Sequence, residues 1–103
     1  MNTPEFEKIV QERTEKITDV FVKKAKEYAQ AGDRLHHFKV AARMKGESEA
    51  KALWGMAVKH LVNVEDLVEG RLEPTPHYID EKIGDMINYL ILLEALLLEK
   101  EQK

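Results

Sequence analysis

The apolar run at residues 83–98 constrains the fold more than any other feature of the sequence. On a helix its Ile, Leu and Met side chains point in all directions, and a helix that is apolar on every face must be buried on every face. A chain of 103 residues has too few other helices to cover it completely. Because an exposed apolar surface of that size is a liability, we expect a helix at residues 77–100 that lies partly in an interface between copies of the chain.

The first part of the sequence has the spacing of a long helix. Thr3 is expected as its N-cap, with Pro4 at the first helical position. Apolar side chains recur every three or four residues until Gly32, which is expected to end the helix after about 28 residues in a left-handed conformation. The stripe consists of Phe6, Ile9, Val10, Ile17, Val20, Phe21, Ala25 and Tyr28, and two cations, Arg13 and Lys24, fall within it.

Two further helices precede the last one. A short helix is expected at residues 37–44, closed by Gly46, and Ser48 is expected to cap a helix at residues 48–69 that Gly70 ends. The core side of that second helix is expected to contain Leu53, Trp54, Ala57, Leu61, Val64 and Val68. The segment after it holds two prolines and is expected to be non-helical. The sequence thus predicts an all-α bundle of three long helices and one short helix, with the last helix buried in an oligomer interface.

Composition and charge narrow the class of protein. The content of 44% hydrophobic and 34% charged residues is typical of one folded domain, which we place at residues 1–103. The absence of cysteine and the charged first residues favour the cytosol over secretion. The net charge of −3 argues against nucleic-acid binding through basic patches, whereas a free nucleotide needs far fewer cations. The run at 83–98 is shorter than the roughly 20 apolar residues that a membrane span needs, so no membrane contact is expected.

The last helix carries polar groups inside its apolar run. Glu81, Asp85 and Asn88 are spaced four and three residues apart and therefore share one face. A carboxylate among apolar residues needs a partner, because burying it alone is costly. Two interpretations of Asp85 stay open, a structural salt bridge and a metal or nucleotide site. The candidate partners for a salt bridge are Lys59, His60 and Arg13.

A second group of acids lies on the preceding helix. Glu65, Asp66 and Glu69 follow an acid-acid-x-x-acid spacing, which places Glu65 and Glu69 one turn apart. Such acids occur routinely on exposed helices. Facing Glu81 and Asp85 on an antiparallel neighbour, they would instead offer the oxygen ligands that Mg²⁺ prefers. The candidate metal ligands are therefore Glu65, Glu69, Glu81 and Asp85.

The segment at residues 33–39 combines both charge signs with two histidines and an aromatic side chain. Arg34 or Lys39 can hold a phosphate there, and Phe38 can stack on a base. The alternative is a capped turn with Phe38 in the core. Adjacent histidines on a helix point in different directions, and the chain has no cysteine, so a zinc site is not expected.

Three segments resemble the family called nucleotide modification associated domain 1, a small helical family found largely in bacteriophages and prophages. They are residues 33–39 (DRLHHFK), 54–67 (WGMAVKHLVNVEDL) and 80–90 (DEKIGDMINYL), within a resemblance that covers roughly residues 20–98. His37 departs from the family pattern, which favours asparagine. The resemblance implies a role with nucleotides or modified bases in the cytosol of a host cell. The matched positions give the candidate nucleotide-binding residues Arg34, His37, Phe38, Lys39, Lys59, His60, Asn88 and Tyr89.

A more distant resemblance is to the MazG-like nucleoside triphosphate pyrophosphohydrolases, which are all-helical and oligomeric. Glu65, Asp66 and Glu69 match the first half of their metal motif, and Asp85 matches the end of the second half. The glutamate expected three residues before Asp85 is Lys82, although an acid stands one position earlier. This resemblance implies Mg²⁺ as a cofactor and cleavage between nucleotide phosphates.

Three hypotheses for function follow. The first is Mg²⁺-dependent hydrolysis of a nucleotide. The second is sequestration of a nucleotide without cleavage, as phage proteins do against host immune signals. Its phosphate contacts would come from Arg13, Lys24, Arg34 and Lys59, and its stacking partners from Phe38, Tyr89 or Trp54. The third is a structural or partner-binding bundle, in which the polar groups fix the register of the helices.

Overall fold

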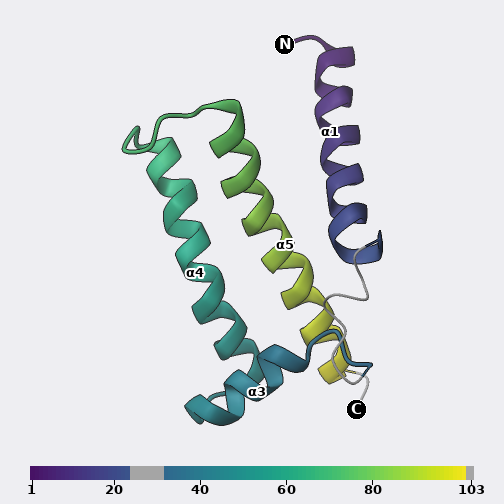
Figure 1. Ribbon diagram of the computed structural model, residues 1–103, viewed down its shortest axis with the longest axis vertical. Coiled ribbons are helices and arrows are strands. Elements are labelled where there is room, and N and C mark those ends of the chain that lie inside the picture. Colours follow the sequence, from purple (N-terminus) through teal and green to yellow (C-terminus); the bar gives the residue numbers. More distant parts are fainter. Residues whose placement is uncertain (24–31, 102–103) are drawn as a thin grey trace. The chain divides into compact units, whose positions relative to one another are not determined.

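The computed structural model describes residues 1–23 and 32–101. These residues form α1 (Thr3–Thr18), the π-helical turn η1 (Asp19–Lys23), α3 (His36–Lys45), α4 (Glu49–Val68) and α5 (Pro76–Glu101), and they contain no β-strand (Figure 1). The predicted all-α class, with three long helices and one short helix, is confirmed. No helix within this part of the chain is both long enough and apolar enough to cross a membrane.

The chain divides into two compact units, residues 1–34 and residues 35–103, and each is described by itself. The expectation of a single domain over residues 1–103 stays a prediction. In the first unit, α1 begins one residue earlier than the sequence predicted, because Asn2 and not Thr3 is the N-cap. The Asn2 side chain accepts a hydrogen bond from the Glu5 amide, and the Glu5 carboxylate accepts one from the Asn2 amide. This reciprocal pair satisfies the backbone amides of Asn2 and Glu5 at the start of the helix.

The predicted long helix keeps its α geometry only as far as Thr18. It continues as the π-helical turn η1, and the backbone carbonyl of Phe21 in that turn accepts a hydrogen bond from Arg34 Nη1 at 2.9 Å. Phe6, Ile9 and Val10 of the predicted stripe are exposed. The stripe positions Ala25 and Tyr28, and the cation Lys24, lie outside the described residues. Gly32 has the positive φ expected of it, 76°.

The second unit consists of α3, α4 and α5, and its helix ends follow the sequence signals. Gly46 ends α3 in the left-handed conformation at a φ of 66°. The Ser48 hydroxyl accepts from the Lys51 amide and caps α4, which is the N-cap that the sequence predicted. The Thr75 hydroxyl accepts from the Tyr78 amide at the start of α5. Local side-chain chemistry therefore sets where these helices begin and end.

The core of the second unit lies between α4 and α5, which run antiparallel side by side, and α3 packs against α4 at the end where α4 begins (Figure 1). Leu35, Leu53 and Leu96 form its buried centre. The partly buried side chains around that centre are Phe38, Ala50, Tyr89, Leu92 and Leu93. Leu53 is fully buried. Among the described residues, no charged or polar residue is buried.

One prediction about the apolar faces needs correction. Trp54, Leu61 and Val68 were expected on the core side of α4 but are exposed, because α3 and α5 cover only one side of that helix. Helix α5 keeps uncovered apolar side chains, as expected for a chain of this length, since Leu90, Leu97 and Leu98 are about half exposed. The structure contains one chain and does not show a contact with another copy, but the apolar surface that led us to expect such a contact is present.

Candidate functional site

The acids at the end of α4 are bound by a cation that the sequence analysis did not single out. Arg71, in the loop after α4, donates from Nε to Asp66 at 2.8 Å and from Nη2 to Glu65 at 3.1 Å. These charge-assisted hydrogen bonds, first to Asp66 and then to Glu65, raise the pKa of Arg71. Glu65 is thus part of an exposed ion-pair cluster that closes the turn after α4.

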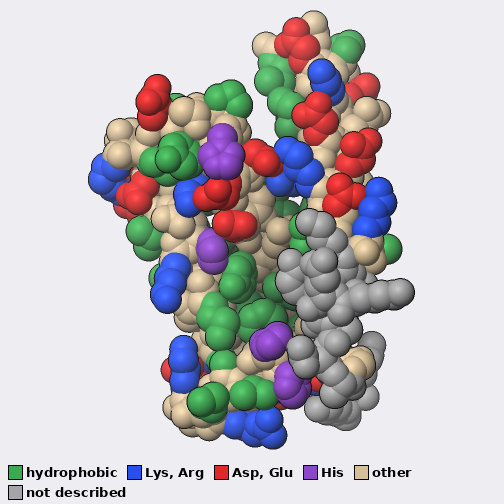
Figure 2. Space-filling model, viewed as in Figure 1, with side chains coloured by type: hydrophobic (Ala, Val, Ile, Leu, Met, Phe, Trp, Pro, Cys, Tyr) green, Lys and Arg blue, Asp and Glu red, His purple; other side chains and the backbone are tan. Residues whose placement is uncertain are grey.

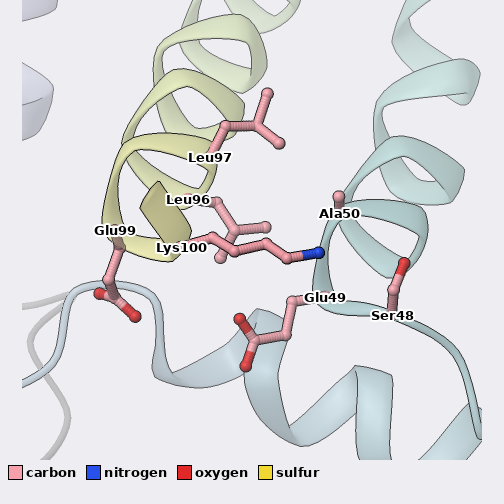
Figure 3. A pocket seen from close by; sticks show the side chains of 7 residues that line it. All are labelled: Ser48, Glu49, Ala50, Leu96, Leu97, Glu99 and Lys100. Atoms are coloured by element: carbon pink, nitrogen blue, oxygen red, sulfur yellow. The ribbon is translucent and has the colours of Figure 1, made fainter. Parts of the chain in front are cut away.

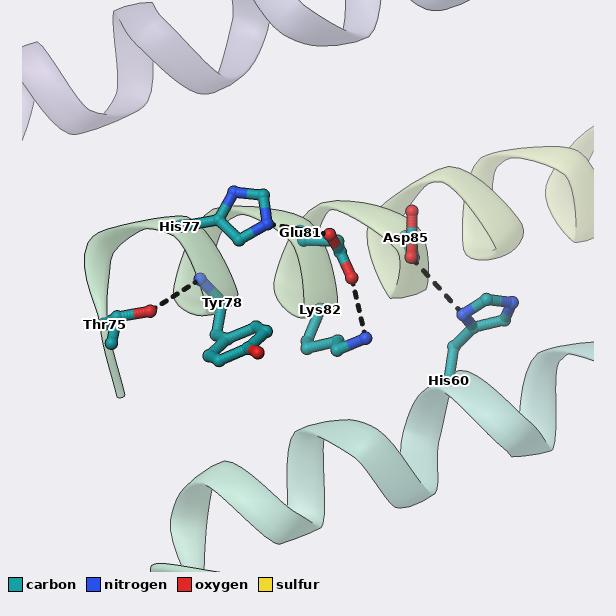
Figure 4. A network of polar contacts seen from close by, with 7 residues as sticks. All are labelled: His60, Thr75, His77, Tyr78, Glu81, Lys82 and Asp85. Atoms are coloured by element: carbon teal, nitrogen blue, oxygen red, sulfur yellow. Dashed lines mark hydrogen bonds and ion pairs between the residues drawn. The ribbon is translucent and has the colours of Figure 1, made fainter. Parts of the chain in front are cut away.

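Glu81 at the start of α5 is also paired (Figure 4). Lys82 Nζ lies 2.7 Å from Glu81 Oε1, and His77 Nε2 lies 3.2 Å from Glu81 Oε2. The hydrogen bond from Lys82 lowers the pKa of Glu81, and the same bond raises the pKa of Lys82. Charged and histidine side chains gather on the surface over the end of α4 and the start of α5 (Figure 2). That surface therefore contains charges of both signs.

The four predicted metal ligands do not form one site. Across residues 1–23 and 32–101, no three His, Asp or Glu side chains are placed to hold a metal ion together. Glu65 and Glu81 already have cations as partners, and Lys82 beside Glu81 adds a positive charge that opposes Mg²⁺. The arrangement of these carboxylates does not fit a magnesium site, although Mg²⁺ stays a prediction that binding data can test.

Asp85 contacts one of the partners named from the sequence. His60 projects from α4 toward Asp85 on α5, and His60 Nδ1 lies 3.6 Å from Asp85 Oδ2 (Figure 4). The side chain of His60 is 26% exposed and that of Asp85 is 41% exposed. Nδ1 itself is buried and has no hydrogen bond in the described part of the chain. The pair is therefore loose and partly exposed, and the carboxylate of Asp85, the more exposed of the two side chains, can accept a further hydrogen bond.

An aromatic cluster lies beside this pair. The rings of His60 and Tyr89 are stacked, with centroids 4.7 Å apart and planes inclined by 27°. Phe38 meets Tyr89 edge-on, with ring centroids 6.4 Å apart. Because Phe38 lies on α3, His60 on α4 and Tyr89 on α5, only the folded unit brings the three rings together. We call Phe38, His60, Tyr89 and Asp85 the aromatic site.

The remaining predicted nucleotide-binding residues are dispersed. Lys39 Nζ lies 2.6 Å from Glu99 Oε1, so the ammonium group of Lys39 already forms an ion pair. The ring of His37 lies edge-on to His36, with centroids 5.9 Å apart. Arg34, which belongs to the other unit, is bound to its own unit's backbone. Lys59 is exposed and Asn88 is half-buried, and they lie next to His60 and Tyr89 in the sequence.

A separate pocket of about 290 Å³ lies where α4 begins and α5 ends (Figure 3). It contains none of the residues predicted to bind a metal or a nucleotide. Its side chains are an ammonium, two carboxylates, a hydroxyl and small or branched apolar groups, which is an ordinary mixture where two helix ends meet. The residues that line it are Ser48, Glu49, Ala50, Leu96, Leu97, Glu99 and Lys100.

Sequence reasoning missed the partners that occupy the acids. His77 stands four residues before Glu81, and this spacing is a helical signal that could have identified the pair. Arg71 in the loop after α4 contacts Asp66 on α4, and Glu99 on α5 contacts Lys39 on α3. No helical spacing rule predicts either contact. Comparison with known proteins gives no match, whether with family models, curated proteins or solved structures.

Proposed function

We propose that the chain binds a nucleotide, or a similar small phosphorylated ligand, at the aromatic site. The observation that carries this proposal is the convergence of Phe38, His60 and Tyr89 from three helices beside the half-exposed carboxylate of Asp85. Three of these four residues belong to the set that the sequence resemblance implied for nucleotide binding. An aromatic surface next to a hydrogen-bonding group is the arrangement by which proteins hold a base.

Each part of the site has a separate task. Base stacking on an aromatic ring is worth about 1–3 kcal/mol, and the His60–Tyr89 stack offers such a surface. The Asp85 carboxylate accepts hydrogen bonds from the amino groups of a base, as acidic side chains do with cytosine. Lys59, next to His60 on the exposed side of α4, supplies a cation for a phosphate.

The arrangement favours holding the nucleotide over cutting it. Cleavage between phosphates with Mg²⁺ needs converging carboxylates, and Glu65 and Glu81 are instead paired with Arg71 and Lys82. The stacked rings and the carboxylate need no metal to bind a base. This is the sequestering form of the function, in which a phage protein in the host cytosol withholds a nucleotide signal.

We propose in addition that copies of the chain associate through α5. Leu90, Leu97 and Leu98 are about half exposed, and with Leu93 and Glu94 they border a shallow apolar hollow. Leu90→Glu places a charge in that hollow without touching the buried core, so it should reduce the oligomer mass in sedimentation velocity. An unchanged mass would argue against this contact.

The first experiment is incubation of the purified protein with nucleoside triphosphates, dinucleotides and cyclic nucleotides, each with and without Mg²⁺. Chromatography of the supernatant and of the heat-denatured protein separates the outcomes. An intact nucleotide that is depleted from solution and recovered on denaturation supports the proposal. Products that appear only with Mg²⁺ point to hydrolysis, and no depletion across the panel overturns the nucleotide function.

A matched pair of variants tests the site itself. Tyr89→Leu keeps an apolar side chain against the core but removes the stacked ring, so affinity should fall about tenfold or more. Tyr78→Leu, on the same helix, removes a tyrosine that lies outside the aromatic site and should bind like the parent. Equal losses for both variants would indicate a general effect on α5.

A further inference from the structure

The outward side of α4 carries an apolar stripe that nothing in the second unit covers. Its members are Trp54 (44% exposed), Val58 (38%), Leu61 (44%) and Val62 (50%), spaced by four, three and one residues on one helix face. The core side of the same helix is already filled by Ala52, Leu53 and Ala57, which are buried. The stripe is therefore additional to the core.

Gly55 lies in the middle of α4 and is exposed beside this stripe. Glycine is among the poorest helix formers, and a Cβ added at this position would meet no atom within 4 Å. Within the part of the chain that the structure describes, neither backbone conformation nor packing requires glycine there. It leaves a gap in the surface next to Val58 that a side chain from outside can fill.

We propose that the α4 stripe is a contact between two copies of this chain, in which the two α4 helices pack antiparallel about a two-fold axis at Val58. The first argument is charge. Lys51 and Glu65 stand seven residues before and after Val58, on the stripe side of the helix, and Glu65 also contacts Arg71 of its own chain. An antiparallel pairing centred at Val58 brings Lys51 next to the partner's Glu65 at both ends, whereas a parallel pairing opposes like charges.

The second argument is the size of the side chains. In this pairing, Trp54 lies on the same flank as the partner's Leu61, and the partner's Val62 lies over Gly55. A large aromatic ring thus meets a branched side chain, and a branched side chain fills the gap at the glycine. The Val58 side chains of the two copies meet at the axis. Tryptophan is also one of the residue types enriched among the side chains that contribute most to binding at protein interfaces.

This contact goes beyond the proposed nucleotide binding and does not depend on it. It uses the side of α4 that carries Trp54, whereas the association proposed through α5 uses Leu90, Leu97 and Leu98. A chain with two self-complementary surfaces forms assemblies of more than two copies. The two contacts are tested separately, because each has its own variants.

The chain has no cysteine, so a single introduced cysteine reports one position only. Val58→Cys should form a covalent dimer under mild oxidation, because packed helix axes about 8–10 Å apart bring residues on the axis within disulfide reach. Val68→Cys, on the same helix and 77% exposed, is the control. In the proposed pairing its two copies are roughly 30 Å apart and should not cross-link. No cross-link at position 58, or equal cross-linking at both positions, overturns the pairing.

Charge reversal tests the antiparallel register. Lys51→Glu alone should weaken self-association about tenfold, because the two glutamates at each end of the contact then repel. Glu65→Lys alone should do the same, and the double variant should return to within about twofold of the parent. Because Glu65→Lys also removes the contact with Arg71, Arg71→Gln is the control that loses this contact and keeps the charge at position 65. Sedimentation velocity over a range of concentrations measures all of these variants. Failure of the double variant to recover would refute the pairing of Lys51 with Glu65.

Discussion

Asp85→Asn separates a ligand contact from a structural salt bridge. The substitution keeps the size of the side chain and removes its charge. The His60–Asp85 pair is 3.6 Å long and its side chains are 26% and 41% exposed. A half-exposed pair of this kind contributes less than about 1 kcal/mol to folding, whereas breaking a buried pair costs about 3–5 kcal/mol. We therefore expect the free energy of unfolding to fall by less than about 1 kcal/mol.

The effect on binding should be larger than the effect on stability. A hydrogen bond to a charged group is worth about 1.5–3 kcal/mol, which corresponds to at least a tenfold loss of affinity for a base that donates to Asp85. Urea unfolding followed by circular dichroism measures the stability, and equilibrium dialysis measures the affinity for whichever nucleotide the panel identifies. Glu73→Gln removes one charge from an exposed position in the loop before α5 and is the matched control.

Two results would refute this reasoning. The first is a loss of 3 kcal/mol or more in the free energy of unfolding, which is a large part of the net stability of a small unit. Such a loss would mean that Asp85 is a structural residue. Unchanged affinity in a stable variant would mean that the carboxylate does not contact the ligand. The first result would contradict our inference that a partly exposed ion pair contributes little to folding. The second would contradict the assignment of Asp85 to the ligand site.

Three further predictions concern the fold and its charges. Leu53→Ala empties the fully buried centre of the second unit and should lower the free energy of unfolding by about 2–5 kcal/mol in urea denaturation; a loss below 1 kcal/mol would mean that the core is elsewhere. Because Lys82 lowers the pKa of Glu81, the stabilisation from this pair is present above the pKa of an unfolded glutamate and is lost as the pH falls through the lower folded value. In NMR titration of the glutamate carboxyls, Lys82→Met should therefore raise the Glu81 pKa. Asn2→Ala removes the cap of α1 and should reduce helicity at the first turn, measured by amide exchange, at a cost of about 1 kcal/mol.

Local sequence signals were sufficient to predict the four α-helices of the described residues and most of their ends. Ser48, Gly46 and Gly70 mark helix boundaries through interactions within a few residues, and the structure has boundaries at these positions. The one N-cap that was wrong, Thr3, differs by a single residue, because Asn2 and Glu5 form a better reciprocal pair. Such interactions are local, so spacing and residue type were sufficient to predict them.

Which side chains meet could not be predicted in this way, because it depends on how the helices pack. Trp54 and Leu53 are neighbours in an apolar stretch, yet Leu53 is fully buried and Trp54 is 44% exposed, because α5 and α3 cover one side of α4. Likewise, Glu65 is bound by Arg71 and Asp85 faces His60, pairings that depend on the loop after α4 and on the packing of α4 against α5. Periodicity identifies an apolar face but not its partner, since burial depends on residues that are distant in the sequence.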